Sequence, residues 1–280
     1  MGLRSAGRTR RGGGRALVFA AALGAAGMPA ASLSAWADDL RKDDMAEVAA
    51  CAPQLVIRDR VTAPAEGGLR LQGGALAAFP ALRLEDGAAA LLAKEAVGRT
   101  VEIRAESEPD RWGRLPAGAV MVAGAGGGAP LWLEARLVAQ GLAVVAPRPG
   151  ARCIQPLLTR EQAARNAGRG RWAEPANRPV AASDLARLNA LEGRYALVEG
   201  RISAVNTRGR TVYVNFGRRW REDFTVMIAS RDRRAFAQAG LELARMAGET
   251  VRVRGHIEAR GGPAIEVRVP GQIERLGAGK

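Results

Sequence analysis

The segment 208–221 holds the densest group of ligand-binding side chain types in this chain. Five arginines stand there with three aromatic residues: Arg208, Arg210, Tyr213, Phe216, Arg218, Arg219, Trp220 and Arg221. Guanidinium groups contact phosphates and aromatic rings stack on bases, so this composition predicts binding of single-stranded nucleic acid, DNA or RNA. The alternatives are a plain basic surface that serves solubility, or one that binds anionic lipid or polysaccharide.

Alternation along residues 211–216 divides this group between two faces of a strand. Val212 and Val214 have the character of core residues, and Phe216 shares their face. Tyr213 therefore points outward. The expected nucleic-acid-binding residues are Arg208, Arg210, Tyr213, Arg218, Arg219, Trp220 and Arg221.

The net charge of +14 is unevenly distributed over the 280 residues. Residues 38–174 carry 18 basic and 17 acidic side chains, whereas residues 175–280 carry 19 and 11. The basic character therefore belongs to the last third of the chain. With 48% hydrophobic and 25% charged residues, the composition indicates a globular protein, and its length fits two domains.

Residues 1–37 have the three parts of a secretory signal peptide. Five arginines and no acid precede the apolar run 16–26, and Ala35-Trp36-Ala37 is a small-x-small cleavage pattern. A membrane anchor is the alternative, but the apolar run is about half the length that a spanning helix needs. We expect an exported protein, periplasmic or secreted, without stable membrane insertion after signal cleavage.

Cysteine and histidine are scarce, which limits the possible chemistry. Two cysteines exclude a zinc ribbon and a four-cysteine iron–sulfur site, and a single histidine excludes a histidine pair. Export favours a Cys51–Cys153 disulfide over two separate buried thiols. His256 lies within a strand pattern and is expected to be structural. Cys153 is a poor candidate nucleophile, because no histidine of its own domain can activate it.

The chain divides into a signal peptide (1–37), a lead-in (38–53), a first domain (54–173), a linker (174–189), a second domain (190–276) and a tail (277–280). In the first domain the patterns predict strands over 54–57, 69–72, 75–79, 99–104 and 119–122. They predict helices over 88–97, 131–140 and 159–168. The last helix is expected to open at the capping box Thr159–Gln162.

The second domain shows a similar order of elements. Its patterns predict strands over 194–205, 211–216, 224–228, 249–258 and 264–269, with one helix over 231–239 after the third strand. Three strands, a helix and two strands is the order of an OB barrel. The expected fold class is mainly β (α+β), with two tandem five-stranded OB-type barrels, the first followed by two helices.

Four sequence patches in residues 55–173 lie in a familiar order. They are the turn 110–114 (DRWGR), the helix 132–143 (WLEARLVAQGLA), the stretch 157–165 (LLTREQAAR) and the step 170–172 (GRW). Together they resemble the thermonuclease family, the staphylococcal nuclease-like proteins. Residues beyond 190 resemble an extra barrel carried by some secreted members.

The resemblance implies calcium-dependent hydrolysis of DNA and RNA phosphodiester bonds. It implies carboxylates from a Gly-Asp-Thr after the first strand and from an acidic loop after the third, with two arginines holding the phosphate. Arg114 matches the arginine of the turn, and Arg70 the strand arginine. The family's acids are not recognisable: residues 74–78 carry none, and Asp59 is flanked by Arg58 and Arg60.

Displaced acids remain an alternative, because Glu85 and Asp86 supply carboxylates if the alignment slips by several residues. Otherwise they are a solvated pair at a helix start. Arg70 and Arg114 also have a structural alternative, as partners of Glu102, Glu106 or Asp110.

Trp112 and Trp172 are expected in the core, with a role as base-stacking platforms as the alternative. The function expected is nucleic-acid binding with lost or impaired hydrolysis. An active calcium-dependent nuclease and an envelope interaction protein are the two rival hypotheses.

Overall fold

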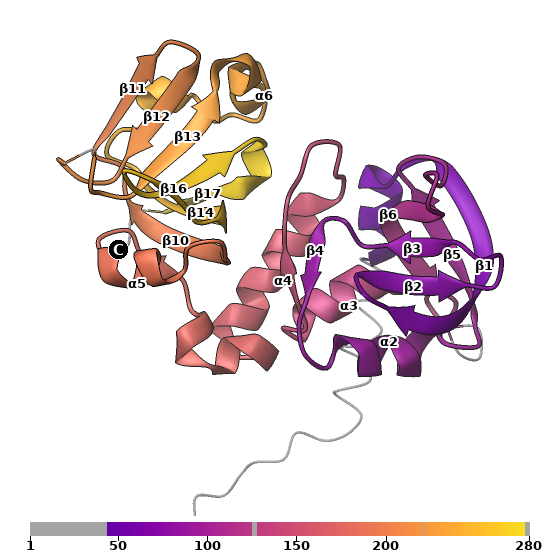
Figure 1. Cartoon of the computed structure of the whole chain (residues 1–280). Coiled ribbons are helices and arrows are strands. Elements are labelled where there is room, and N and C mark those ends of the chain that lie inside the picture. Colours follow the sequence, from indigo (N-terminus) through magenta and orange to yellow (C-terminus); the bar gives the residue numbers. More distant parts are fainter. Residues whose placement is uncertain (1–43, 125–127, 220, 278–280) are drawn as a thin grey trace, which may run out of the picture.

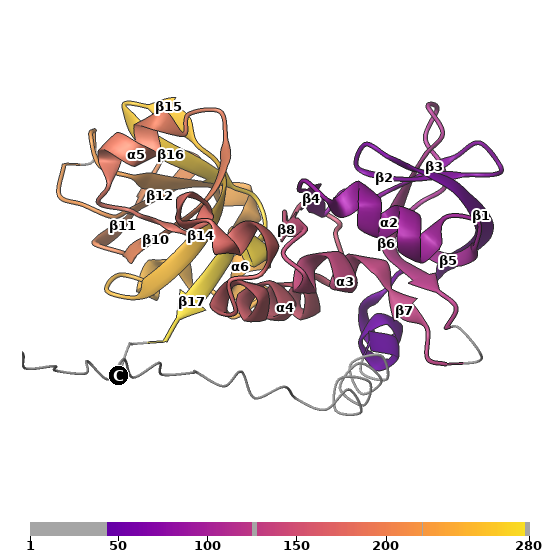
Figure 2. The same ribbon diagram turned by 90° about the horizontal axis from the view of Figure 1, so that it is seen from below.

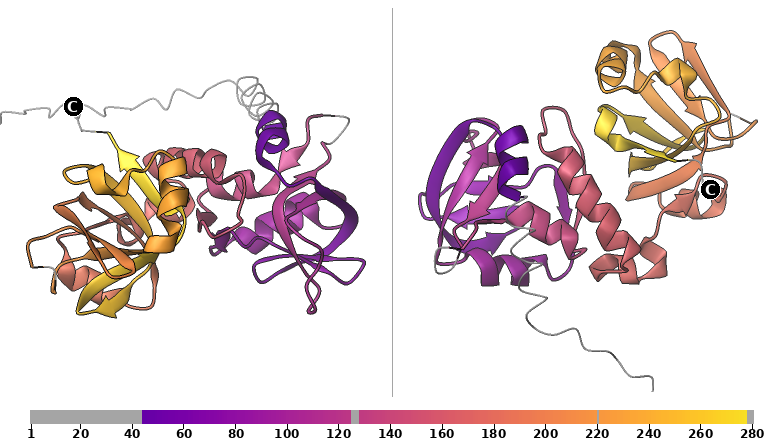
Figure 3. Two further views of the ribbon diagram at one scale, coloured as in Figure 1. Left: turned by 90° about the horizontal axis from the view of Figure 1, so that it is seen from above. Right: turned by 180° about the vertical axis from the view of Figure 1, so that it is seen from behind.

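The computed structural model describes residues 44–124, 128–219 and 221–277. The chain is mainly β, with helices between the strands, and it forms two lobes (Figure 1). Helix α4 (Ile154–Asn166) lies between the lobes, as views from below, above and behind also show (Figures 2 and 3). The expected signal peptide, residues 38–43 of the lead-in, Trp220 and residues 278–280 of the expected tail lie outside the described residues.

The first lobe combines short strands with three helices that follow or interrupt them. Its strands are β1 (Leu55–Ala65), β2 (Gly68–Leu71), β3 (Leu76–Ala78), β4 (Leu82–Leu84), β5 (Thr100–Ala105), β6 (Arg114–Val122), β7 (Leu131–Trp132) and β8 (Ala143–Val145). Its helical segments are α2 (Ala88–Ala96), α3 (Leu133–Ala139), α4 and the 3-10 turn η2 (Gly170–Ala173). Strand pairings run without a break from β1 through β2, β3, β6 and β5 back to β1.

The alternation that predicted the strands decides which side chains enter the first core. In β5, Val101, Ile103 and Ala105 are buried and the residues between them are not. Helix α2 ends before Gly98, whose φ of 77° is the left-handed conformation that glycine adopts easily at this position. These two predictions are confirmed.

Three expectations about the first lobe are wrong. Helix α4 begins at Ile154, so the capping box at Thr159 lies inside it, where the Thr159 hydroxyl donates to the carbonyl of Gln155. Residues 131–132 pair with β6 as β7 instead of opening helix α3. Trp112 is 66% exposed, whereas Trp172 is buried as expected.

In the second lobe the strands divide between two sheets. Its strands are β9 (Val180–Ala181), β10 (Tyr195–Arg201), β11 (Ala204–Arg208), β12 (Thr211–Asn215), β13 (Thr225–Ala229), β14 (Thr250–His256), β15 (Glu258–Arg260), β16 (Gly262–Val267) and β17 (Ile273–Leu276). The orders are β17-β14-β10-β9 and β11-β12-β13-β16-β15. In the described part these sheets are not closed into a clear barrel.

The long strand predicted over 194–205 bends between β10 and β11. A side chain at Gly200 would collide with Phe216, whose Cδ1 atom lies 2.8 Å from the Cβ position, so the close approach requires glycine. Helices α5 (Leu185–Ala190) and α6 (Arg233–Gln238) flank the sheets. The expected linker is partly structured, since it contains the 3-10 turn η3 (Pro175–Asn177) and β9.

The Cys51–Cys153 disulfide is confirmed. It joins the end of the helical segment 44–51 to the residue before α4. Arg160 of α4 strengthens the same connection through ion pairs with Asp44 and Glu47. The N-terminal helix is thereby attached to the helix that lies between the two lobes.

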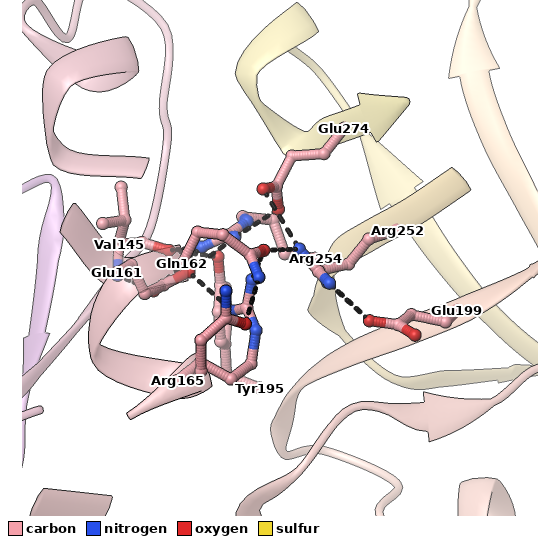
Figure 4. Close-up of polar contacts among 10 residues, drawn as sticks. Val145, Glu161, Gln162, Arg165, Tyr195, Glu199, Arg252, Arg254 and Glu274 are labelled. Carbon is pink, nitrogen blue, oxygen red and sulfur yellow. Dashed lines mark hydrogen bonds and ion pairs between the residues drawn. The ribbon is translucent and has the colours of Figure 1, made fainter. Parts of the chain in front are cut away.

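A buried polar network joins the two lobes (Figure 4). The side chain of Arg254, on β14, is completely buried and donates to Glu161 of α4 at 2.7 Å and to the carbonyl of Val145 at 2.9 Å. Glu274 of β17 is a second carboxylate partner of Arg254. The Tyr195 hydroxyl donates to the same carbonyl of Val145 at 3.1 Å.

The outer part of the network continues along β14. Arg252 donates to Glu199 at 2.7 Å and to Gln162 of α4 at 2.8 Å, and Arg165 contacts Glu161 at 3.4 Å. Three arginines and three glutamates therefore meet at this interface, and their charges balance. If the lobes moved apart, buried charges would lose their partners, which is energetically costly. The network therefore favours the one arrangement in which all six side chains meet.

Candidate nucleic-acid interface

Arg70 and Arg114 occupy equivalent positions on the two sides of β3. Leu76 of β3 pairs with Arg70 of β2 in an antiparallel ladder and with Arg114 of β6 in a parallel one. Residues that lie opposite each other in a sheet share a face, and both arginines are exposed. Adjacent strands are about 4.8 Å apart, so two long side chains from these positions can reach one ligand.

Both arginines line one groove of about 970 Å³, here called the arginine groove. The segments after β1 and after β3 form part of its wall, as does the turn that precedes β6. Its charged lining residues are Arg70, Arg114, Arg148, Glu66, Glu106 and Asp110. Sequence reasoning missed Arg148, because it lies between two prolines in a loop without a periodic pattern.

Two of the three acids in this groove already bind other parts of the protein. Glu106 forms an ion pair with Arg148, and burial raises the pKa of its carboxyl group. Asp110 accepts backbone N–H hydrogen bonds from Trp112 and Arg114, both at 2.9 Å. Asp110 therefore shapes the turn that presents Arg114.

Arg70 and Arg114 were alternatively expected to form structural ion pairs with acidic residues nearby, and the described residues show no such pair. Glu102 contacts Arg58 at 2.8 Å and Arg104 at 2.7 Å, and the hydrogen bond from Arg58 is the main cause that lowers its pKa. No described carboxylate forms an ion pair with Arg70 or Arg114. Their guanidinium groups are left for a ligand.

The acids present do not fit the calcium ion that the resemblance implies. Calcium takes 6–8 oxygen ligands, mostly from carboxylates. The wall segments expected to supply them carry Glu66 after β1 and Phe79-Pro80 after β3. Asp59 instead accepts the backbone N–H of Gly73 at 3.0 Å. Among the described residues, no three His, Cys, Asp or Glu side chains are arranged to hold a metal ion.

Glu85 and Asp86 lie outside the arginine groove. Glu85 forms an ion pair with Arg171 of η2 and lines an adjoining groove, which shares Ala65, Glu66 and Gly67 with the arginine groove but contains neither Arg70 nor Arg114. Asp86 is exposed just before helix α2. The structure therefore does not bring these acids to Arg70 and Arg114.

Trp112 lies exposed at the tip of the turn before β6 and not in the core. The guanidinium carbon of Arg111 lies 3.9 Å from the centroid of its ring, and that of Arg114 lies 6.0 Å away. Gly113, with a φ of 72°, allows the tight turn that leaves the ring outside. An exposed indole beside exposed arginines has the geometry to stack on a base.

A second groove, here called the sheet groove, lies on the β11-β12-β13-β16-β15 sheet. Its volume is about 780 Å³. Arg208, Tyr213 and Arg218 line it, so the outward orientation expected for Tyr213 is confirmed. Asn215, which shares the face of Tyr213 in the alternation, also lines it, and the lining residues that sequence reasoning missed are Asn206, Met227 and Arg260. Arg260 ends β15, a short strand that was not predicted before the expected turn at 261–263.

The other predicted residues of this segment are not among the residues that line the sheet groove. Arg210 lies in the turn before β12, and Arg219 pairs with Glu222 at 3.0 Å. Arg221 follows in the same loop. The backbone N–H of Arg219 donates to Asp223 at 2.6 Å, which closes the loop beside the groove. Of the predicted residues, only Arg208, Tyr213 and Arg218 therefore line the sheet groove.

His256 has the structural environment expected of it. Its Nδ1 lies 3.3 Å from the carbonyl of Gly193, and its Nε2 lies 3.5 Å from Nη1 of Arg83. The neutral tautomer with hydrogen on Nδ1 satisfies both contacts. Cys153, in turn, is disulfide-bonded and offers no thiol for nucleophilic chemistry.

No protein-family model and no curated protein matches this chain. Within the described residues, no helix has both the length and the apolar character needed to cross a bilayer.

Proposed function

We propose that this protein is an exported, thermonuclease-like nucleic-acid-binding protein in which phosphodiester hydrolysis is lost or impaired. Its ligand is single-stranded DNA or RNA, and its location is the periplasm or the medium. The confirmed disulfide supports export, because such bonds persist in oxidising compartments.

Two tandem OB-type domains are part of the proposal. In the first lobe the continuous pairing of β1, β2, β3, β6 and β5 supports this fold, as do the helices α3 and α4 that follow. In the second lobe the support is the order of three strands, a helix and further strands. OB folds bind single strands on the face around their second and third strands, where the sheet groove lies.

The observation that carries the proposal is the asymmetry between cations and acids in the arginine groove. Arg70 and Arg114 share this groove and have no described carboxylate partner. Glu106 and Asp110, by contrast, are bound within the protein. Phosphate binding requires only the arginines, whereas attack of water on phosphate also needs a general base and stabilisation of the developing charge.

A calcium-dependent nuclease is the second candidate, and Glu66 is the observation in its favour. This residue is exposed, lies after β1, and lines the groove with both arginines. If hydrolysis occurs, Glu66→Gln should abolish it and Glu85→Gln should not.

The test measures binding and cleavage of labelled single-stranded oligonucleotides by the purified protein. We expect saturable binding that weakens steeply as salt rises from about 50 to 200 mM, and no degradation with calcium or with chelator. Degradation that requires calcium would reject the loss of hydrolysis. Undetectable binding at low salt would reject a nucleic-acid ligand and favour an envelope interaction protein.

A matched pair of variants locates the binding. Arg70→Gln with Arg114→Gln removes both guanidinium groups of the groove and should reduce the slope of the salt dependence by about 0.7 for each phosphate that the arginines neutralise. Arg234→Gln removes an exposed arginine of helix α6 that lines neither groove. The control should bind as the unmodified protein does, and an equal decrease in affinity in both variants would contradict a specific groove.

A further inference from the structure

A small cavity lies where the two lobes and the linker meet, and the proposed function does not use it. Its volume is about 140 Å³. Strand β4, strand β8 and η2 of the first lobe form one side, and η3, β9 and β10 form the other. The polar side chains that line it are Arg83, Arg171, Arg178, Arg194, Asn177 and Tyr195.

The charge of this cavity is unbalanced. Four guanidinium groups line it, and no carboxylate does. One nearby acid, Glu85, pairs with Arg171. The adjoining network around Arg254 differs, because its three arginines meet three glutamates. Where the two lobes meet, the uncompensated positive charge therefore lies at the cavity and not in the Arg254 network.

Among the described residues, no carboxylate forms an ion pair with Arg83. Its guanidinium carbon lies 5.3 Å from the centroid of the Tyr195 ring, and Nη1 lies 3.5 Å from Nε2 of His256. Neither neighbour carries a carboxylate, so both orient the side chain without compensating its charge. The remaining guanidinium donors of Arg83 are left for another acceptor.

The other three arginines also have spare donors. No described side chain or carbonyl accepts a hydrogen bond from the guanidinium groups of Arg178 and Arg194. Arg171 donates to Glu85 and to Asn177, but its buried Nε has no partner among the described residues. An unsatisfied buried donor is unfavourable, and several cations around one small space repel each other.

We propose that this interdomain cavity binds a small oxyanion of the phosphate class. Arginine guanidinium groups match the oxygen geometry of phosphate, and each contact is a charge-assisted hydrogen bond. Cavities for larger ligands measure about 300–1,000 Å³, so a volume of 140 Å³ is too small to enclose a whole nucleotide and suits a single tetrahedral ion. Because both lobes and the linker supply its walls, a bound ion stabilises their arrangement.

The experiment titrates inorganic phosphate into the purified protein by calorimetry, at constant ionic strength held with chloride. The Arg70→Gln, Arg114→Gln double variant removes the arginine groove as a competing phosphate site. We expect saturable binding of one phosphate in this variant, with a dissociation constant below about 1 mM. The absence of saturable binding up to about 10 mM phosphate would overturn the proposal.

Variants of the cavity decide where the ion binds. In the same background, Arg83→Gln with Arg194→Gln should weaken phosphate binding at least tenfold, because charge-assisted hydrogen bonds to the ion are removed. Arg178→Gln alters only an exposed linker side chain, so it tests the same site without risk to the fold. Arg234→Gln is the control and should leave binding unchanged. Unchanged phosphate binding in both cavity variants would overturn the assignment.

Thermal unfolding gives a second readout. A ligand that binds only the folded state raises the melting temperature with its concentration. Phosphate should therefore raise the Tm of the double groove variant, and chloride at equal ionic strength should not. The proposed oligonucleotide sites are the arginine groove and the sheet groove, which share no lining residue with this cavity, so a failure of one proposal leaves the other testable.

Discussion

Arg70 and Arg114 are 44 positions apart in the sequence, yet each lies directly opposite Leu76 of strand β3. The antiparallel β2–β3 ladder fixes one arginine and the parallel β3–β6 ladder fixes the other. The same face of three neighbouring strands therefore presents two cations to one groove. This relationship is the strongest structural support for phosphate binding.

Trp112 should contribute to nucleic-acid binding through stacking. Trp112→Ala removes the exposed indole beside Arg114 and should weaken oligonucleotide binding by about 1–3 kcal/mol. Because the ring is 66% exposed, the free energy of unfolding should change little. Fluorescence anisotropy and urea unfolding measure the two effects. Trp112→Phe, which keeps an aromatic ring, should retain most of the affinity.

The sheet groove should bind single strands independently of the arginine groove. Tyr213→Ala removes a ring from its lining, and Arg218→Gln removes a charge. Both changes should lower affinity, but only Arg218→Gln should also reduce the salt dependence, since an uncharged ring releases no counterions. Oligonucleotide titrations at several salt concentrations distinguish them. If neither variant differs from the unmodified protein, the sheet groove has no role in binding.

Arg254 should be essential to the stability of the joined lobes. Arg254→Met removes the 2.7 Å partner of the buried Glu161 and leaves it only the 3.4 Å contact with Arg165, so it should lower the free energy of unfolding by about 3–5 kcal/mol. Arg275→Met is a matched control on β17, because it removes an exposed ion pair with Glu249 and should cost at most about 1 kcal/mol. Differential scanning calorimetry compares them. Similar Tm values for both variants would contradict the importance of the buried network.

Glu134 should make stability depend on pH. Its side chain is buried, and burial raises the pKa to about 7 from an ordinary value of 4.5. Between these values the folded state holds a proton that the unfolded state releases, so stability falls as pH rises through this window. The decrease amounts to at most about 1.4 kcal/mol per pH unit.

The control for this titration is Glu134→Gln. The amide oxygen can still accept the hydrogen bond from the backbone N–H of Val120, which lies 3.0 Å from the carboxyl oxygen of Glu134. Urea unfolding at pH 5 and pH 8 should show a smaller difference for the variant than for the unmodified protein. Equal differences would mean that Glu134 does not titrate in this range.

The Cys51–Cys153 disulfide closes a sequence separation of 102 residues. Replacing both cysteines by serine should lower the free energy of unfolding by about 2–4 kcal/mol, because the unfolded chain regains freedom. The Arg160 ion pairs should keep helix 44–51 near α4. Chemical denaturation of the variant tests the magnitude, and unchanged stability would contradict the expected effect.

Local patterns in the sequence are sufficient for elements that carry their own periodicity. The alternation in residues 99–104 predicts β5, and the apolar helix before Gly98 predicts α2. Short strands such as β4 and β8 could not be predicted, because three residues show too little alternation. These two segments become strands only because β4 pairs with β8. The exposure of Trp112 could not be predicted from the local pattern either, because the exposure depends on the geometry of the turn and on the packing around that turn.

The sequence alone determined the composition of the site: its arginines, its exposed aromatic candidates, the cysteine pair and the lack of recognisable acids. Only the tertiary structure decided that Arg70 and Arg114 share a groove, that Glu106 and Asp110 bind within the protein, and that four arginines enclose the interdomain cavity. The physical reason is that residue type fixes what a side chain can bind. Which partner it meets depends on strand register and domain packing, which bring together residues far apart in the chain.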